Sequence, residues 1–294
     1  MKSKDLNNLL TADDITLIKN KINEIYETKN ISNPIIKDDI FRLLESECIV
    51  LYYPVEDEDA CAFYKQEENE NQEIKKFAFI NTAMPFEKQI FAAAHELAHI
   101  LGITEERQEV LKSENIREYT DHNHRESYET DKVERIANRF AAEFLVPEEI
   151  LLTELKKICK KKAKIELEYI VELMDVFLVP YKTMVIRLRE IGKLSDIKEY
   201  EYYLNLDARS EKSQVVMLQR ELGKCQRNND ITKVKKMPNY VKMALELFDQ
   251  SAKTYEKLKC QLTTFGFIPE DFNIEQKEES FLSEEELNKL LEES

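Results

Sequence analysis

The stretch that decides the fold is Phe91-Ala-Ala-Ala-His95-Glu96-Leu97-Ala98-His99-Ile100-Leu101-Gly102. On a helix, residues four positions apart lie on one face, so His95 and His99 point the same way. Two imidazoles placed like this can take two corners of a tetrahedral zinc site, and the Glu96 carboxylate can accept a proton from water at the open corner. The chain has four histidines in all, so this spacing rarely arises by accident. The competing interpretation is a buried helix with two hydrogen-bonded histidines.

The composition indicates a mostly helical protein with a sizeable core. The 294 residues allow one large domain or two ordinary ones, and they are 43% hydrophobic and 34% charged with four glycines. The net charge of −15 argues against a general nucleic-acid binder, because contact with phosphates needs a basic surface. The charge suits a soluble protein and permits a basic partner.

Cysteine usage and hydropathy favour a cytoplasmic location. The five cysteines are scattered and none forms a C-x-x-C pair, which is typical of a reducing compartment. The N-terminal residues are polar and show no apolar signal region, and no apolar run approaches the roughly 20 residues that span a bilayer. We therefore expect no membrane association.

The order of the predicted elements indicates an α+β fold that is mostly helical. Residues 11–29 and a segment after Pro34 have helical periodicity, and Thr11 is the expected N-cap of the first helix. Residues 48–55, 60–65 and 76–81 are strand-like, and their short connections predict a small three-stranded antiparallel sheet, arranged as a meander. The helix that carries His95 and His99, which we call the metal helix, should begin at Pro85 and end at Gly102.

The rest of the chain divides into a long polar stretch, a run of helices and a changed C-terminal part. Residues 103–130 show no clear periodicity, and a loop of that length inside a compact domain is often functional. Helices are predicted from residue 131 to Pro147 and onward to residue 191. We predict three regions: residues 1–193 as a catalytic-type domain with N-terminal helices, 194–238 as a polar linker with a labile helix, and 239–294 as a helical C-terminal extension.

A catalytic zinc site of this type needs a third protein ligand and an open position for water. Glu105 is one candidate, six residues after His99, in a spacing that resembles the metzincin layout, although that layout has histidine there. His122 or His124 is another, because histidine is the commonest transition-metal side chain.

The third candidate, and the one we favour, is Glu134 in the next strongly periodic helix. Asn138 lies four residues later on the same face, where its amide can orient a ligating imidazole. Ala137 and Ala141 are small, so this helix can approach the metal helix closely. The competing interpretation is an ordinary first-turn glutamate favoured by the helix dipole.

These motifs carry a resemblance to a known family. Ile80-Asn81, the His95–His99 motif and Glu134-x-x-Ala137-Asn138-x-Phe140-Ala141-Ala142-x-x-Leu145-x-Pro147 look like the ImmA/IrrE metallopeptidases, over about residues 40–192. The resemblance implies a zincin-like metallopeptidase core in which His95, His99 and Glu134 bind Zn²⁺ and Glu96 is the catalytic base. The interval between His99 and Glu134 is long for the family, and the last hundred residues have a loose counterpart only.

The resemblance also implies a function: a cytoplasmic zinc endopeptidase that cleaves a helix-turn-helix repressor, or an antitoxin-like regulator, and so switches on mobile-element, stress or defence genes. A substrate strand can add to an edge of the sheet. The oxyanion formed during cleavage needs a second stabiliser. The candidates for it are His122, His124, Tyr119, Tyr128 and Tyr181.

Two other interpretations stay open. A toxin or defence peptidase would act on a host or partner protein. A regulatory protein with a structural or idle metal site would act by binding a repressor or DNA. The lysine-rich segment 156–164 and the helix pair around Pro180 motivate the DNA version. A solvated helix face is the favoured explanation of the lysines, and the turn has Pro where helix-turn-helix motifs often have Gly.

Overall fold

The structure is a computed structural model that describes residues 10–57, 60–68, 74–103, 122–159, 164–224, 231–237, 240–250 and 254–275, with the backbone alone for residues 122–131. The chain forms two compact units, Met1–Pro238 and Asn239–Ser294. Within the described parts, no helix is both long enough and apolar enough to cross a membrane.

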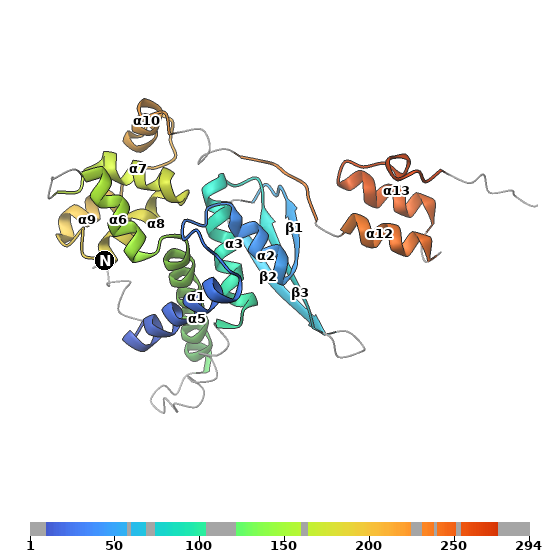
Figure 1. The fold of residues 1–294 in the computed structure, drawn as a ribbon, viewed down its shortest axis with the longest axis horizontal. Helices are drawn as coiled ribbons and strands as arrows, with labels where there is room; N and C mark the ends of the chain where they lie inside the picture. Colours follow the sequence, from blue (N-terminus) through green and yellow to red (C-terminus); the bar gives the residue numbers. More distant parts are fainter. Residues whose placement is uncertain are drawn as a thin grey trace, which may run out of the picture. The chain divides into compact units, whose positions relative to one another are not determined.

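The first unit is a helix-rich body with a small sheet at one side, next to α2 and α3 (Figure 1). In chain order they are α1 (Ala12–Thr28), α2 (Asp39–Glu47), β1 (Ile49–Tyr53), β2 (Ala62–Glu68), β3 (Ile74–Asn81), α3 (Phe86–Ile100), α5 (His122–Leu145), α6 (Glu148–Cys159), α7 (Leu167–Phe177), α8 (Tyr181–Glu190), α9 (Ile197–Leu204) and α10 (Gln214–Glu221). The prediction of a mostly helical α+β fold is confirmed.

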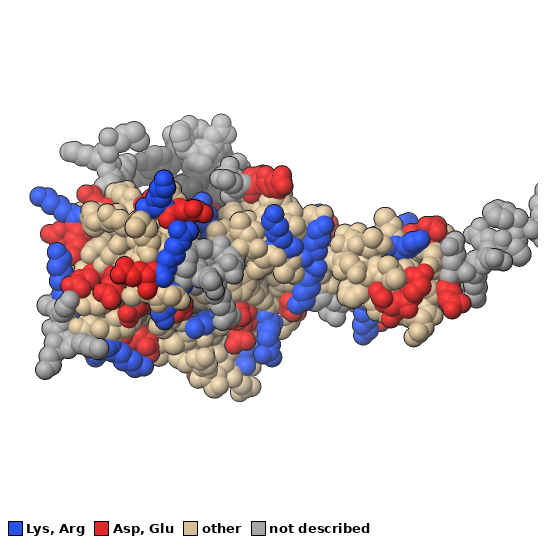
Figure 2. Space-filling view, turned by 90° about the horizontal axis from the view of Figure 1, so that it is seen from above, with Lys and Arg blue, Asp and Glu red and all other residues tan. Residues whose placement is uncertain are grey.

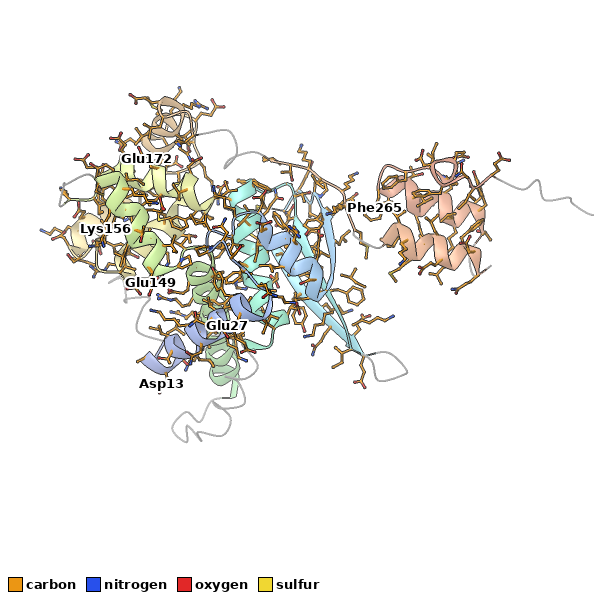
Figure 3. All side chains as sticks on the ribbon, viewed as in Figure 1. Asp13, Glu27, Glu149, Lys156, Glu172 and Phe265 are labelled. Carbon is orange, nitrogen blue, oxygen red and sulfur yellow. The ribbon has the colours of Figure 1, made fainter. Side chains whose placement is uncertain are left out.

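The helix periodicity of the sequence matches the burial of the outer helices. Thr11 caps α1 in a capping box with Asp14, as its position predicted. The buried residues of this helix include Ile18, Ile22 and Ile25, which recur at helical spacing. The charged side chains labelled on α1 and α6 in Figure 3, such as Asp13 and Lys156, belong to the exposed sides of these helices. Each helix therefore faces the core with one apolar stripe.

The sheet is mixed, so the predicted antiparallel meander is wrong. Its strand order is β1-β3-β2, with β1 parallel to β3 and β2 antiparallel to β3. A meander requires each strand to pair with the next one in sequence. Here the chain leaves β1, crosses the end of β3 and returns as β2 on the far side, so the last strand lies in the middle.

The side chain of Asn81 holds this crossing in place. It is 1% exposed and lies at the end of β3. Its Oδ1 accepts a hydrogen bond from the Val55 amide at 3.0 Å, and its Nδ2 donates to the carbonyl oxygens of Val55 at 3.0 Å and Ala60 at 2.8 Å. A buried amide with these partners replaces the strand pairing that the connecting segment lacks. The crossing brings Cys61 and Ala62 to the side of α3.

Helix α3 is buried on most of its surface because other elements of the unit pack around it. The small residues Ala93, Ala94 and Ala98 are fully buried, and the helix packs against α2, α5, β2 and β3. Lys76 of β3 donates a hydrogen bond from Nζ to the Ile100 carbonyl oxygen at 2.6 Å, which satisfies an acceptor of the last turn. Gly102 follows with φ of 70°, the left-handed conformation that ends helices without steric cost to glycine.

Helix α5 begins at His122, earlier than the predicted start at residue 131. The segment 122–130 was expected as part of a loop because it is polar throughout and carries no apolar stripe. Periodicity detects a helix through the face that it buries, so it found the later turns of α5 and missed the first ones. Glu134 therefore lies in the interior of a long helix, and a first-turn role is wrong for it.

The segment predicted as a polar linker contributes to the core. Helices α9 and α10 lie within it, and Leu194, Tyr203 and Val215 belong to the main hydrophobic core. The Tyr203 hydroxyl donates to the Ile165 carbonyl oxygen at 3.0 Å. Tyrosines and isolated apolar residues make these contacts. Because the overall hydrophobicity of the segment is low, its packing could not be predicted from composition.

Residues 231–236, which we call the strap, run along the sheet and the start of α3. Lys236 and Tyr52 exchange backbone hydrogen bonds of 2.7 and 3.0 Å in an antiparallel bridge. Thr82 accepts a bond from the Lys233 amide at 2.9 Å and donates its hydroxyl to the Val234 carbonyl oxygen at 2.7 Å. The strap therefore occupies the outer side of β1 at Tyr52.

The second unit contains α12 (Tyr240–Asp249), α13 (Tyr255–Thr264) and the 3-10 turn η2 (Pro269–Phe272). Ala244, Leu258 and Leu262 form its small core. Thr254 caps α13 through a hydrogen bond from the Lys257 amide. This unit is a short helical hairpin with a core of its own.

Candidate metal centre

Helices α3 and α5 bring three potential metal ligands together. His95 and His99 project from one face of α3, and Glu134 reaches them from α5. Nε2 of His95 lies 3.1 Å from Nε2 of His99 and 3.1 Å from Oε2 of Glu134. Nε2 of His99 lies 3.7 Å from Oε1 of Glu134. The ligand atoms of the three residues all fall within 4.8 Å of one another.

This donor set fits a zinc ion. Imidazole nitrogen and carboxylate oxygen bind Zn²⁺ at about 2.0–2.1 Å in a tetrahedron, which separates neighbouring donor atoms by roughly 3.3 Å. The separations of 3.1 and 3.7 Å lie close to that value. Three protein donors leave one corner of the tetrahedron for water or substrate, the pattern of a catalytic site.

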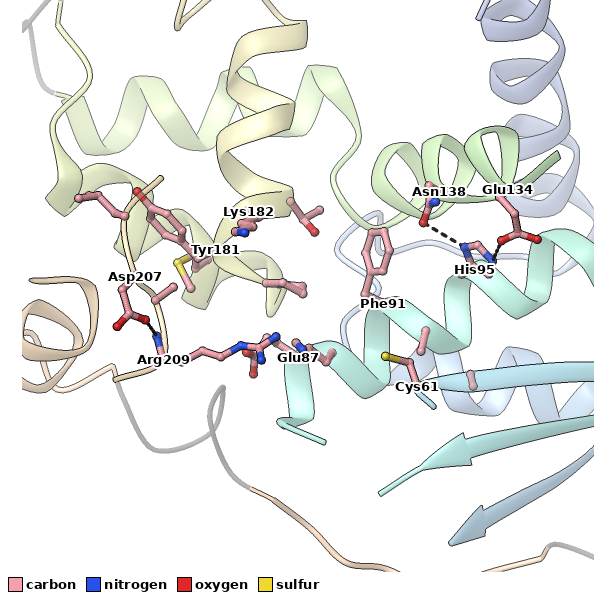
Figure 4. Close-up of a pocket in the computed structure, with 18 of the residues that line it drawn as sticks. Cys61, Glu87, Phe91, His95, Glu134, Asn138, Tyr181, Lys182, Asp207 and Arg209 are labelled. Atoms are coloured by element: carbon pink, nitrogen blue, oxygen red, sulfur yellow. Dashed lines mark hydrogen bonds and ion pairs between the residues drawn. The ribbon is translucent and has the colours of Figure 1, made fainter. Parts of the chain in front are cut away.

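Asn138 fixes the orientation of His95. Its Oδ1 lies 3.1 Å from Nδ1 of His95, one turn after Glu134 on α5 (Figure 4). The amide oxygen can only accept, so Nδ1 donates its N–H to Asn138 and Nε2 faces the cluster. An acceptor behind a ligating histidine also increases its basicity.

The ionisation of the three residues is coupled by their short separations. Burial lowers the pKa of His95, but the hydrogen bond to Glu134 and the negative charge of Glu96 outweigh it, so the pKa of His95 is raised. Burial and the nearby charge of His95 lower the pKa of His99. The hydrogen bond from His95 lowers the pKa of Glu134, which keeps this carboxylate ionised. The cluster therefore offers neutral His99 and anionic Glu134 as donors at neutral pH.

Glu96 lies next to the cluster and is 6% exposed. Burial raises the pKa of its carboxyl to about 7, with an opposing contribution from His95. A carboxylate whose pKa is near the working pH can both accept and return a proton.

A cavity of about 830 Å³ opens beside these residues. His95, Glu96, Glu134 and Asn138 line one part of it, together with Cys61 and Ala62 from the start of β2. The other part lies between the first turns of α3, the start of α8 and residues 205–209 (Figure 4). The cavity is large enough for several side chains of a bound polypeptide.

The other residues proposed from the sequence do not lie in the described part of the centre. His122, His124 and Tyr128 belong to the first turns of α5, where the side chains fall outside the described atoms, and Glu105 and Tyr119 lie outside the described residues. Tyr181 lines the cavity, but its hydroxyl donates to the Tyr203 carbonyl oxygen at 2.9 Å. Its proton is therefore committed to the backbone and is not directed at a reacting group.

Sequence reasoning missed a buried ionic network that supports α5. The Arg187 side chain of α8 is fully buried and donates from Nε and Nη2 to the Val146 carbonyl oxygen at 3.1 and 2.9 Å. It is also paired with Glu143 at 2.9 Å and with Glu190, and Arg139 joins the same two carboxylates. The network connects the end of α5 to α8, so it helps to place the helix that carries Glu134. No local pattern separates Arg187 from an exposed helical arginine.

The described lysines of the segment 156–164 are surface residues, and the helix pair around Pro180 is mostly buried. Lys157 pairs with Glu154 at 2.6 Å and Lys164 with Glu199 at 3.7 Å. On the face shown in Figure 2, Lys and Arg side chains are interspersed with Asp and Glu. Most of α8 is buried, including Met184 and Arg187, whereas a recognition helix must expose one face to a DNA groove.

A helix that presents two histidines and a buried glutamate to a cavity beside a small sheet is typical of metallopeptidases. Residues 48–189 match the family model Peptidase_M78, the IrrE N-terminal-like domain. Residues 48–189, which contain α3, α5 and all three strands, thus form a domain of this family. The predicted resemblance is confirmed over this range. No curated protein sequence and no solved structure gives a significant match to the chain.

Proposed function

We propose that the protein is a cytoplasmic zinc-dependent endopeptidase with His95, His99 and Glu134 as metal ligands. The observation that carries this proposal is the convergence of these three side chains, from two helices, beside the buried Glu96 on a cavity. A bound zinc ion supplies Lewis-acid polarisation of a peptide carbonyl and lowers the pKa of water.

Glu96 is the proton carrier of the proposed reaction. Its carboxylate takes a proton from the attacking water and passes it to the leaving amine. The pKa near 7 suits both transfers, because a much stronger acid would not accept the proton and a much weaker one would not release it. Asn138 holds the His95 ring so that Nε2 faces the cluster.

The sheet supports the proposal with a place for an extended substrate. The start of β2 lies at the cavity, through Cys61 and Ala62, and β2 pairs with β3 on its inner side. The outer side of β1 is occupied at Tyr52 by the strap. Of these two outer strands, β2 is therefore the one placed to add a substrate strand next to the metal centre.

For the substrate we propose a regulatory protein, such as a helix-turn-helix repressor or an antitoxin-like regulator, whose cleavage switches on mobile-element, stress or defence genes. Family membership supports this proposal, and so does the size of the cavity, which admits several residues of an unfolded or extended segment.

The test combines metal analysis with one substitution. The zinc-loaded protein and its Glu96→Gln variant are incubated with the regulator encoded by the neighbouring gene, and fragments are identified by mass spectrometry. We expect equal zinc content and a loss of cleavage of about 10²–10⁴-fold in Glu96→Gln, whereas Glu27→Gln on the exposed side of α1 leaves the rate unchanged. An active Glu96→Gln variant would overturn the mechanism, and an intact but bound regulator would indicate a binding role.

A further inference from the structure

The part of the cavity away from the metal centre contains a buried acid. Glu87 lies in the first turn of α3, and Glu87, Phe91 and His95 follow one another at four-residue spacing along one side of this helix (Figure 4). Glu87 is 7% exposed, yet it lines the cavity. Its Oε2 is fully enclosed and has no hydrogen-bond partner.

An enclosed carboxylate oxygen without a hydrogen-bond partner is unusual, because a buried ionised group normally has partners that replace its water. Attraction to the positive N-terminus of a helix explains an acidic residue in the first turn. When such a residue is exposed, however, water supplies the hydrogen bonds that the enclosed Oε2 of Glu87 lacks. Burial raises the pKa of Glu87 to about 7, and Arg209 opposes this effect. No described cationic side chain forms an ion pair with Glu87. The site is therefore suited to a cation that comes from a bound molecule.

Arg209 indicates what kind of cation fits. It extends from the segment 205–209 toward Glu87 across the cavity (Figure 4). Arg209 is exposed, and no ion pair within 4.0 Å joins it to Glu87 among the described side chains. An exposed guanidinium without an ion pair to Glu87 can be displaced by another cation that enters from the cavity.

The part of α3 between Glu87 and His95 contributes the apolar residues Phe91 and Ala92 to the cavity lining. Met174 and Leu206 add further apolar surface to this lining. Apolar walls with a carboxylate at the end match a long basic side chain, whose methylene stem packs on the walls while its charged head pairs with the acid.

We propose that Glu87 forms a specificity subsite for an arginine or lysine side chain of the bound polypeptide, and that Arg209 competes with this side chain for Glu87. The inference rests on the proposed function, since the cavity then holds a substrate chain. Glu87 and His95 are eight residues apart on α3, which corresponds to roughly 12 Å along the helix axis. An extended chain advances about 3.3 Å per residue, so the basic residue lies within about four residues of the bond at the metal centre.

The test measures binding on the zinc-loaded full chain with Glu96→Gln, so it does not depend on cleavage. The probes are fluorescein-labelled alanine–serine decapeptides with a single arginine moved through every position, and matched peptides with norleucine or glutamate instead. We expect one register in which the arginine peptide binds about tenfold more tightly than its norleucine counterpart by fluorescence anisotropy. Adding Glu87→Gln removes this preference, the exposed control Glu27→Gln on α1 retains it, and Arg209→Ala increases arginine-peptide affinity.

Several results would overturn the subsite. They are equal affinity for arginine and norleucine in every register, no measurable binding of any peptide, an arginine preference that survives Glu87→Gln, or a glutamate preference that disappears with Arg209→Ala. Thermal melting checks that Glu87→Gln is folded, and Glu87→Met serves as a second neutral variant of similar length. Cleavage by the wild-type chain without an arginine preference leaves the proposed function standing and rejects the subsite. An arginine preference without any cleavage supports the subsite and rejects the peptidase.

Discussion

The Asn138 side-chain oxygen lies 3.1 Å from Nδ1 of His95, so α5 supplies both a carboxylate for the metal cluster and the acceptor that orients a histidine of α3. We expect Asn138→Ala to lower zinc affinity by about 10–100-fold, because the His95 ring loses its fixed tautomer and orientation. Competition with a chromogenic chelator measures the change. Asn205→Ala, at the far part of the same cavity, is the matched control and should leave zinc affinity unchanged. Equal affinities for Asn138→Ala and the wild type would contradict the assignment.

Zinc should stabilise the folded chain. A metal that binds the native state alone adds about 2.7 kcal/mol to the free energy of unfolding at a hundredfold excess over its Kd. We therefore expect a chelator to lower the Tm of the wild-type protein measured by calorimetry. In Glu134→Ala the chelator should change the Tm far less, since the anionic donor of the cluster is missing. A wild-type Tm that does not respond to zinc or to its removal would speak against a metal site.

Arg187→Met should destabilise the protein by about 3–5 kcal/mol, because it leaves Glu143 and Glu190 with Arg139 as their remaining partner and removes both guanidinium hydrogen bonds to the Val146 carbonyl oxygen. Urea denaturation gives the change in the free energy of unfolding. The control is Arg42→Met, whose guanidinium is 85% exposed and pairs with Asp39 at 3.8 Å. An exposed pair of this kind contributes about 0–1 kcal/mol. Similar losses in the two variants would show that the buried network has little effect on stability.

Glu87 should make stability depend on pH. Its folded pKa of about 7 exceeds the ordinary value of 4.5, so the folded state binds more protons than the unfolded state between these two values. The free energy of unfolding therefore falls as the pH rises from 4.5 to 7, by roughly 3 kcal/mol at most. The other titratable and charged groups that line this cavity are His95, Glu96 and Glu134 of the metal centre, together with Lys88, Lys182, Asp207 and Arg209.

Glu87→Gln isolates this contribution. The variant should match the wild type near pH 4.5 and exceed its stability at pH 8, because glutamine has no charge to bury. Chemical denaturation across this pH range provides the measurement, with Glu27→Gln as the exposed control. A constant difference between Glu87→Gln and the wild type at all pH values would contradict the raised pKa.

The parts of the fold that depend on neighbouring residues could be predicted from the sequence. Thr11 and Asp14 determine the start of α1 through their own hydrogen bonds, and Gly102 ends α3 through its own backbone conformation. The spacing of His95 and His99 places both rings on one side of α3, because a helix repeats every 3.6 residues. These features need no knowledge of the rest of the chain.

The parts that depend on distant contacts could not be predicted. The order of the strands follows from the crossing that Asn81 holds, and nothing in a strand-like stretch reveals its partner. Glu87 and Arg187 have the sequence context of exposed helical residues, and their burial follows from the elements packed over them. Residue spacing within one helix does not show which other helix packs against it. Glu134 is therefore one of several candidate metal ligands in the sequence.

The strap makes the two edges of the sheet unequal. Where Lys236 bonds to Tyr52, β1 behaves as an interior strand and has no free backbone groups to offer another chain at that point. Deletion of residues 231–236 would remove the bonds to Tyr52 and Thr82 and turn this position into an open edge. Unprotected edges recruit strands from other molecules. The segment that leads into the second unit thus also acts as a guard against self-association of the first.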